Sequence, residues 1–196
     1  MGAVVYDLVE IFESLQGEGR NMGRPCVFIR FAGCNLQCPW CDTNVTKRFS
    51  LSVDEILSEL AQYRAKDVVL TGGEPTLQQG MPELVAALKD AGYWIAVETN
   101  GTNDADWLSF VDYLACSPKR GAPLRLTSAD EVRVVAEDEQ IVDFCREVRG
   151  KTVATDYYVS PCDRGGQIDF ATAKSVLARL SGWSLSVQLH KLLGFR

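Results

Sequence analysis

Short apolar runs alternate with amphipathic stretches along the whole chain. The apolar runs predict buried strands at 25–33, 67–73, 94–101, 112–118, 131–137, 152–161 and 184–190. The amphipathic stretches predict helices at 53–65, 81–92, 137–150 and 169–182. Alternation of this kind is typical of right-handed βαβ units around a parallel sheet.

The ends of two predicted helices carry recognisable signals. Ser52 is followed three residues later by Glu55, the pattern of a capping box at a helix start. The stretch 81–92 has Pro82 near its beginning and Gly92 just past its end. These signals support the helix boundaries inferred from the apolar pattern.

The length of the chain limits the fold to one domain. A chain of 196 residues can bury one core but falls short of the roughly 250 residues of a complete eight-fold barrel. We therefore expect a single α/β domain over 1–196, an incomplete parallel β/α barrel of about six to seven strands. The cysteine-rich and glycine-rich turns follow strand ends, so they should meet at one rim, where ligands bind in such sheets.

Charge and cysteine content narrow the classes of function. The net charge of −6 argues against general binding to nucleic acid or to anionic membranes. The N-terminal region lacks a basic segment followed by an apolar core, and no apolar run reaches the length of a membrane span. The seven cysteines then suggest a reducing compartment, and we expect a cytoplasmic protein.

The cysteines Cys34, Cys38 and Cys41 form a C-x₃-C-x₂-C cluster. Three thiolates can bind three irons of a 4Fe–4S cluster and leave the fourth iron open to another ligand. A zinc knuckle is the alternative, with the fourth ligand from His190 or from another cysteine. Spacing alone leaves both kinds of metal site open.

A second motif, TGGEP, begins at Thr71. Gly72 and Gly73 allow close backbone approach to a ligand, and Glu74 adds a carboxylate suited to an amine. By itself the motif also fits an ordinary tight turn between a strand and a helix. Its place one βα unit after the cysteine cluster makes the pair more specific than either motif alone.

Together the two motifs resemble those of the radical S-adenosylmethionine (SAM) superfamily. LQGEG at 15–19, FIRFAGCNLQCPWCDT, TGGEP, ETNGT, SPK and a terminal HKLLGFR follow in that order. This succession resembles the 7-carboxy-7-deazaguanine synthase family over nearly the whole chain. LQGEG and the terminal HK are its family-specific parts.

The resemblance implies a carbon–nitrogen lyase that uses a 4Fe–4S cluster, SAM and Mg²⁺. Its substrate would be 6-carboxy-5,6,7,8-tetrahydropterin, and its product 7-carboxy-7-deazaguanine, formed by ring contraction with loss of ammonia. Reductive cleavage of SAM would yield a 5′-deoxyadenosyl radical that takes a hydrogen from C6 of the pterin and later returns one. A reductant such as flavodoxin or ferredoxin and a homodimeric state are also implied.

The resemblance further implies which residues bind the cofactors. Cys34, Cys38 and Cys41 would bind the cluster, and Thr43 would bind Mg²⁺, although a threonine here could also be a helix N-cap. The residues expected to contact SAM are Trp40, Cys41, Asp42, Gly73, Glu74, Ser117, Pro118 and Lys119. A contact of the 157–163 segment with the adenine is a further expectation.

The implied substrate contacts come from both ends of the chain: Leu15, Gln16, Gly17, Glu18, Arg30, Thr71, His190 and Arg196. Arg30 suits the substrate carboxylate through a bidentate fork, and an inward arginine in a strand needs such a partner. Arg196 would contribute the terminal carboxylate. No residue is assigned as a catalytic acid or base, with Glu18 and His190 as the candidates. Glu18 could instead stabilise a turn, and a lone histidine could be structural.

Two other functions fit the cysteine cluster alone. An activase of glycyl-radical enzymes would also combine a compact barrel with this spacing, but it would act on a large protein partner. A binding module stabilised by zinc or by an iron–sulfur cluster would need no substrate. LQGEG and the terminal HK favour the small-molecule enzyme.

Overall fold

The computed structural model describes residues 4–195 as one curved, nine-stranded sheet with the strand order β3-β1-β2-β4-β5-β6-β7-β8-β9. The parallel strands are β2 (Pro25–Phe31), β4 (Asp67–Gly72), β5 (Trp94–Thr99), β6 (Tyr113–Cys116), β7 (Ser128–Ala136), β8 (Val153–Pro161) and β9 (Ser184–Leu185). Each lies inside a stretch predicted as a strand or within a few residues of one. The open parallel barrel is confirmed.

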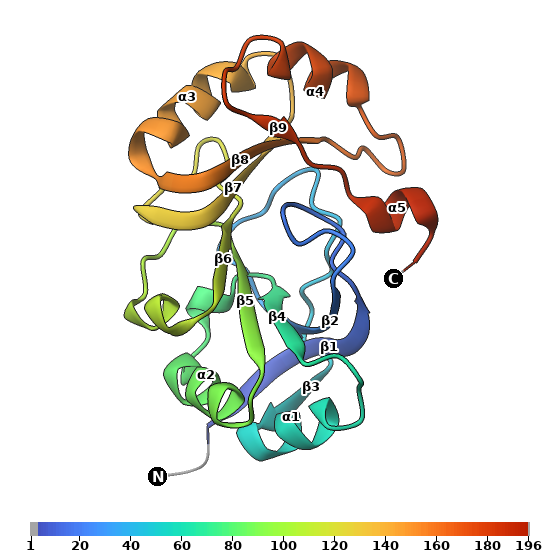
Figure 1. Cartoon of the computed structure of the whole chain (residues 1–196), viewed down its shortest axis with the longest axis vertical. Helices are drawn as coiled ribbons and strands as arrows, with labels where there is room; N and C mark the ends of the chain where they lie inside the picture. The colour runs from blue at the N-terminus through green and yellow to red at the C-terminus, as the bar shows by residue number, and fades with distance from the viewer. Residues whose placement is uncertain (1–3, 196) are drawn as a thin grey trace.

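Four helices cover the outer side of the sheet (Figure 1). They are α1 (Val53–Leu60), α2 (Met81–Asp90), α3 (Ile141–Lys151) and α4 (Phe170–Leu177), with short 3₁₀ turns η1 (Pro75–Leu77) and η2 (Asp106–Phe110). The capping box of Ser52 and Glu55 is formed, and Gly92 follows α2 with a φ of 81°. None of the helices in the described part of the chain is long and apolar enough to cross a bilayer.

Two strands at one edge of the sheet were not predicted. Strand β1 (Val5–Leu15) pairs antiparallel with β2 on one side and with β3 (Phe49–Ser52) on the other. A register shift between Leu8 and Glu10 interrupts the period of two: Leu8 packs in the outer core, whereas Glu10 lines the central cavity. Bulges often turn side chains in this way beside active sites.

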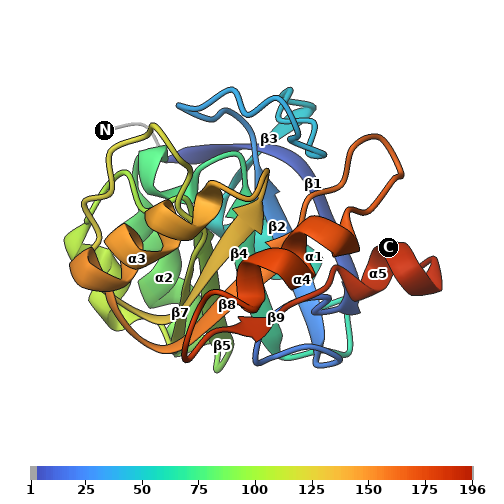
Figure 2. The ribbon, with the colours of Figure 1, turned by 90° about the horizontal axis from the view of Figure 1, so that it is seen from above.

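The predicted strand at 184–190 is wrong beyond its first two residues. After β9 the chain turns into a short helix, α5 (Leu189–Leu193), whose first amide donates to the carbonyl of Gly17 at 3.0 Å. Figure 2 shows α5 and the C-terminus on the side of β1. His190 therefore approaches the interior from a helix that closes the open side of the barrel, and not from a strand end.

Alternate side chains of the strands pack in two separate clusters. Residues such as Leu70, Ile95 and Val132 face the helices and join the large outer core. A small inner cluster of Cys26, Val69, Ala96, Tyr113 and Ala115 fills the bottom of the barrel. The inner cluster stops below the C-terminal ends of the strands, where the cavity begins.

Candidate active site

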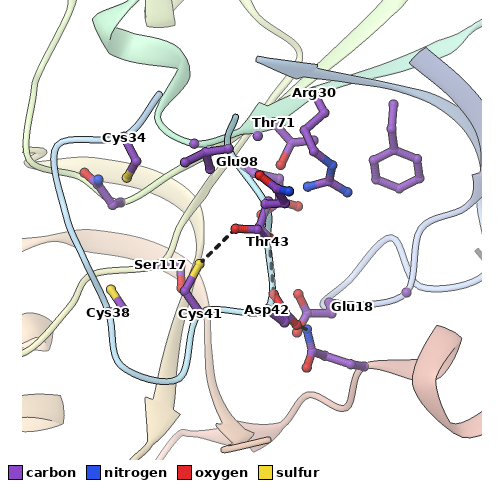
Figure 3. A pocket seen from close by; sticks show the side chains of 18 of the residues that line it. Glu18, Arg30, Cys34, Cys38, Cys41, Asp42, Thr43, Thr71, Glu98 and Ser117 are labelled. Atoms are coloured by element: carbon purple, nitrogen blue, oxygen red, sulfur yellow. Dashed lines mark hydrogen bonds between the residues drawn. The ribbon is translucent and has the colours of Figure 1, made fainter. Parts of the chain in front are cut away.

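A cavity of about 720 Å³ opens at the C-terminal ends of the parallel strands (Figure 3). The predicted site residues that line it are Leu15, Gln16, Gly17, Glu18, Arg30, Cys34, Cys38, Trp40, Cys41, Asp42, Thr43, Thr71, Gly73, Ser117, Lys119 and His190. Of the predicted residues that the structure describes, Glu74 and Pro118 are not part of this lining. Arg196 lies outside the described residues.

The three motif cysteines lie on the loop between β2 and β3. All are free thiols that line the cavity, and Figure 3 shows their sulfur atoms on the inner side of the loop. A bond of 3.1 Å from the amide of Cys41 to the carbonyl of Cys38 holds the turn between them. Burial raises the pKa of Cys38, and the positive charge of Lys119 opposes this shift.

The donor set fits a 4Fe–4S cluster. Within residues 4–195, no three His, Cys, Asp or Glu side chains converge closely enough to hold a single metal ion. A 4Fe–4S cluster needs no such convergence, because each cysteine binds a different iron. Cys34, Cys38 and Cys41 would hold three irons and leave the fourth without a protein ligand.

The glycines of TGGEP pack directly against the beginning of the cysteine loop. The amide of Gly73 donates to the carbonyl of Phe31 and that of Glu74 to the carbonyl of Gly33, both at 3.0 Å. A Cβ atom on Gly73 would lie 1.6 Å from the Gly33 carbonyl oxygen, so no larger residue fits this position. The motif thus sets the position of the cysteine loop as well as one wall of the cavity.

Glu74 lies beneath the cavity lining. Its side chain is fully buried, and its carboxylate accepts hydrogen bonds of 2.7 Å from the Thr99 hydroxyl and the Asn100 amide. The Thr76 hydroxyl donates to it as well, also at 2.7 Å. Through these bonds the carboxylate links the turns after β4 and β5, and its contact with the SAM amine stays a prediction.

Asn35 connects the cysteine loop to the turn after β5. Its amide donates to the Thr102 hydroxyl at 2.8 Å and accepts from the Asn100 side chain at 3.0 Å. Because Asn100 is itself held by Glu74, one chain of hydrogen bonds reaches from TGGEP to the loop. The loop is therefore tied to the sheet beside its first cysteine.

Ser117 and Lys119 lie opposite the cysteine loop at the end of β6. The Lys119 ammonium donates to the Ser117 hydroxyl at 2.6 Å and lies 5.1 Å from the centre of the Trp40 ring. Burial lowers the pKa of Lys119, while nearby thiols and Glu18 oppose the shift. A cation here suits a ligand that carries a carboxylate, such as the methionyl part of SAM.

Polar residues from the loop after β1, from β5 and from β7 form the other side of the cavity. The Gln16 amide donates to Glu98 at 3.0 Å, and the Arg133 guanidinium pairs with both Glu98 and Glu18. Beneath them, burial raises the pKa of Glu131, and hydrogen bonds from the Tyr113 hydroxyl and the Arg20 amide oppose that shift.

Arg30 has the partner that an inward arginine requires. Its Nε donates to Glu10 of β1 at 2.8 Å, and its guanidinium lies 5.9 Å from the centre of the Phe12 ring. Thr71 is its neighbour across the β2–β4 pair. Arg30 and Thr71 thus face the cavity together (Figure 3).

The helix α5 covers the cavity from the open side of the barrel. His190 packs so tightly on Gly17 that a Cβ there would lie 2.4 Å from its Nδ1. Burial lowers the pKa of His190, and the negative charge of Glu18 opposes the shift. Lys191 forms ion pairs with Asp42 and, at 2.7 Å, with Asp163, so α5 is tied to the cysteine loop.

Thr43 follows the cysteine loop at the edge of the cavity. Its hydroxyl donates to Asp42 at 3.2 Å. Pairing with Lys191 lowers the pKa of Asp42 although partial burial opposes it. The next helix after Thr43 is α1, which begins at Val53 with Ser52 as its N-cap, so the alternative of a helix N-cap at Thr43 is wrong.

Comparison with known proteins identifies the architecture and the motifs. Residues 28–153 match the model of the radical SAM superfamily. A 7-carboxy-7-deazaguanine synthase of Neisseria meningitidis is 41% identical over 201 residues, covering 96% of this chain and 93% of the relative. One from Haemophilus influenzae is 40% identical over 200 residues with the same coverage.

The chain belongs to the 7-carboxy-7-deazaguanine synthase family.

A solved structure agrees with this membership. The crystal structure of QueE from Escherichia coli has a TM-score of 0.78 and 26% sequence identity, and the match covers 95% of both chains. SuiB from Streptococcus suis, at 14% identity and a TM-score of 0.51, shares the fold alone. As a member of the radical SAM family, this 7-carboxy-7-deazaguanine synthase uses a 4Fe–4S cluster and SAM. The zinc-knuckle, activase and binding-module alternatives are wrong.

Sequence reasoning missed several residues of the synthase cavity. Glu98 and Arg133 lie within predicted strands and line the cavity together with Gln188 and Lys191. Asp163, at the end of the segment expected near the adenine, lines it as well. A signal was present in the EVRVV stretch, where charged residues alternate with apolar ones. That alternation marks a strand with one polar face, which in a barrel faces the cavity.

Proposed function

We propose that the cavity binds 6-carboxy-5,6,7,8-tetrahydropterin between the cysteine loop and the polar group of Gln16, Glu18, Glu98 and Arg133. The chain then contracts the ring to 7-carboxy-7-deazaguanine with loss of ammonia. The observation that carries the proposal is that thiols for a cluster and acceptors for a pterin edge line the same cavity. When bound, the cluster and SAM supply the 5′-deoxyadenosyl radical.

The chain's own residues bind and orient the substrate. Arg30 uses Nε for Glu10, so its two Nη groups remain to fork onto the substrate carboxylate. Glu18 and Glu98 offer acceptors to the amino edge of the ring, and His190 covers it from α5. Helix α5 and the loop at 16–24 exclude water from the reacting carbon.

The residues nearer the cysteine loop hold SAM. Lys119 and Ser117 bind its carboxylate and ribose, and the backbone of Gly73 accepts its amine. The backbone beside Trp40 and Asp42 lines its adenine. Glu74 acts from beneath, by fixing the turns that carry these groups.

Thr43 binds Mg²⁺ together with the substrate carboxylate and water molecules. Mg²⁺ prefers oxygen ligands in an octahedral shell and keeps several waters, so one neutral hydroxyl from the protein is enough. The protein acts as a homodimer and receives electrons from a flavodoxin or a ferredoxin.

An anaerobic assay with reconstituted protein tests the function. Protein with cluster, SAM, reductant, tetrahydropterin and Mg²⁺ is expected to form 7-carboxy-7-deazaguanine, measured by chromatography with mass detection. Absence of product from protein that binds iron and cleaves SAM would contradict the proposed substrate. Equal activity with and without Mg²⁺, or a Thr43→Ala variant with an unchanged Mg²⁺ requirement, would remove the magnesium role.

A further inference from the structure

Arg133 is the most heavily paired charged residue on the inner face of the sheet. Its side chain is only 4% exposed, although it lies in β7 at the level of the cavity. Nη1 is 2.7 Å from Glu18 and Nη2 contacts Glu98, while Nε lies 2.9 Å from Glu131 as an ion pair without a hydrogen bond, because the Nε–H group does not point at that carboxylate. One guanidinium therefore joins carboxylates from the loop after β1, from β5 and from β7.

The three carboxylates have different surroundings. Glu131 is 2% exposed and lies below the cavity, where the Tyr113 hydroxyl donates to it at 2.7 Å and the Arg20 amide at 2.9 Å. Glu18 and Glu98 line the cavity itself. The negative charge of Glu131 thus balances the guanidinium from below, while Arg133 holds the other two carboxylates against the space above.

We propose that Arg133 is a positioning residue that sets Glu18 and Glu98 side by side as a recognition element for the 2-amino edge of the pterin. This inference rests on the proposed function. Carboxylates only accept hydrogen bonds, so the pair suits adjacent N–H donors such as the 2-amino group and the neighbouring ring N–H. A 2-oxo ring presents an acceptor at that place, which leaves buried acceptors facing one another.

The geometry of arginine explains why lysine would not serve equally well. The planar guanidinium presents its two Nη groups in a fixed fork, so it can hold Glu18 and Glu98 at set angles. Lysine keeps the positive charge but concentrates it at one flexible point. Arg133→Lys should therefore preserve the charge balance of the cluster while loosening the spacing between Glu18 and Glu98. Arg133→Met removes the charge and leaves buried carboxylates uncompensated.

The test measures ligand discrimination in the reconstituted enzyme, without reductant so that no turnover occurs. Affinities are measured for SAM, and then with SAM bound for 6-carboxy-5,6,7,8-tetrahydropterin and its 2-oxo counterpart. The variants are Arg133→Lys and Arg133→Met. Arg20→Met is the control for the loss of a nearby paired arginine, because Arg20 pairs with Asp156 on an exposed part of the surface and does not line the cavity.

The wild type should prefer the 2-amino ligand clearly. Arg133→Lys should weaken its binding by about tenfold or more and reduce the preference, with SAM affinity within about twofold. Folded Arg133→Met should lose more affinity for the 2-amino ligand than Arg133→Lys does. Arg20→Met should show the same affinities and the same preference as the wild type. An unchanged preference in Arg133→Lys, or a parallel loss of SAM and pterin binding, would overturn the positioning role. A wild type that binds neither pterin would instead contradict the proposed function itself, and the inference with it.

Discussion

The two faces of the same strands contrast sharply. On β4, Leu70 faces the helices and is fully buried in the outer core, whereas its neighbour Thr71 faces the cavity. On β7, Val132 and Val134 join the outer core while Glu131 and Arg133 point inward. Adjacent residues of one strand thus belong to different parts of the protein, one stabilising the fold and the other forming the site.

Along the strands, the inner face changes from apolar to polar. Toward the start of the strands it is apolar, with Val69, Ala96 and Ala115 in contact. Toward their ends it carries Arg30, Thr71, Glu98 and Arg133, and the glycine turns follow. A polar upper half above an apolar lower half creates a closed-bottom cavity that opens toward the cysteine loop.

The largest expected effect comes from the cysteine loop. Cys38→Ala should lose the cluster and reduce product formation to background, because one iron loses its protein ligand. Iron content, visible absorbance and product formation measure this, and the free energy of unfolding of the cluster-free protein should change little. Cys145→Ala is the matched control: Cys145 is buried in the outer core, so it should cost about 1 kcal/mol of stability and keep the cluster. Cluster loss in Cys145→Ala as well would contradict the separation of the faces.

A substitution in the outer core should have the opposite profile. Leu84 of α2 is fully buried against the sheet, so Leu84→Ala should lower the free energy of unfolding by about 3 kcal/mol. Urea denaturation measures the loss, and pterin affinity below the transition should stay within about twofold. A large loss of pterin affinity in the folded variant would show that the outer face shapes the site directly.

A substitution of Glu74 tests the link between the turns after β4 and β5. Glu74→Gln places an NH₂ group against the donors of Asn100 or of Thr76 and Thr99, which should cost about 2 kcal/mol of stability. SAM affinity should also fall because the turns shift. The exposed Glu83→Gln on α2 is the control and should change either quantity little. Full SAM affinity in Glu74→Gln would contradict its positioning role.

His190 gives the smallest expected effect. Burial lowers its pKa below the usual 6.5, so the folded state disfavours the protonated ring. The stability that the neutral ring contributes is therefore present above the pKa that His190 has in the unfolded chain. It is lost as the pH falls through the lower pKa of His190 in the folded protein. Between about pH 7.5 and about pH 5.5, His190→Gln should lose less stability than the wild type, by under about 1 kcal/mol. Identical pH slopes in urea unfolding would contradict burial of the neutral ring.

The sequence predicted the parallel strands because both faces are apolar toward the start of the strands, which gives continuous apolar runs such as VVL at 68–70 and IAV at 95–97. It did not predict β1, whose register shift breaks the alternation between Leu8 and Glu10. Helix α5 was predicted as strand because its position depends on contacts with Gly17 and Asp42, which are distant in the chain.

The candidate site was predictable where the chemistry is local. Cys34, Cys38 and Cys41 occupy one loop, and Gly73 lies beside it, so a short motif defines them. Glu98 and Arg133 were missed because they meet only when the sheet curves and brings β5, β7 and the loop after β1 together. No spacing within a single segment records that meeting.

The neighbours Leu70 and Thr71 test the contrast between the faces most directly. Unfolding free energy and tetrahydropterin affinity are measured together for Leu70→Ala and Thr71→Val. We expect Leu70→Ala to lose about 3 kcal/mol of stability with unchanged affinity. Thr71→Val should keep most of its stability and lose about tenfold in affinity. Equal losses of both quantities in both variants would contradict a strand whose two faces serve separate purposes.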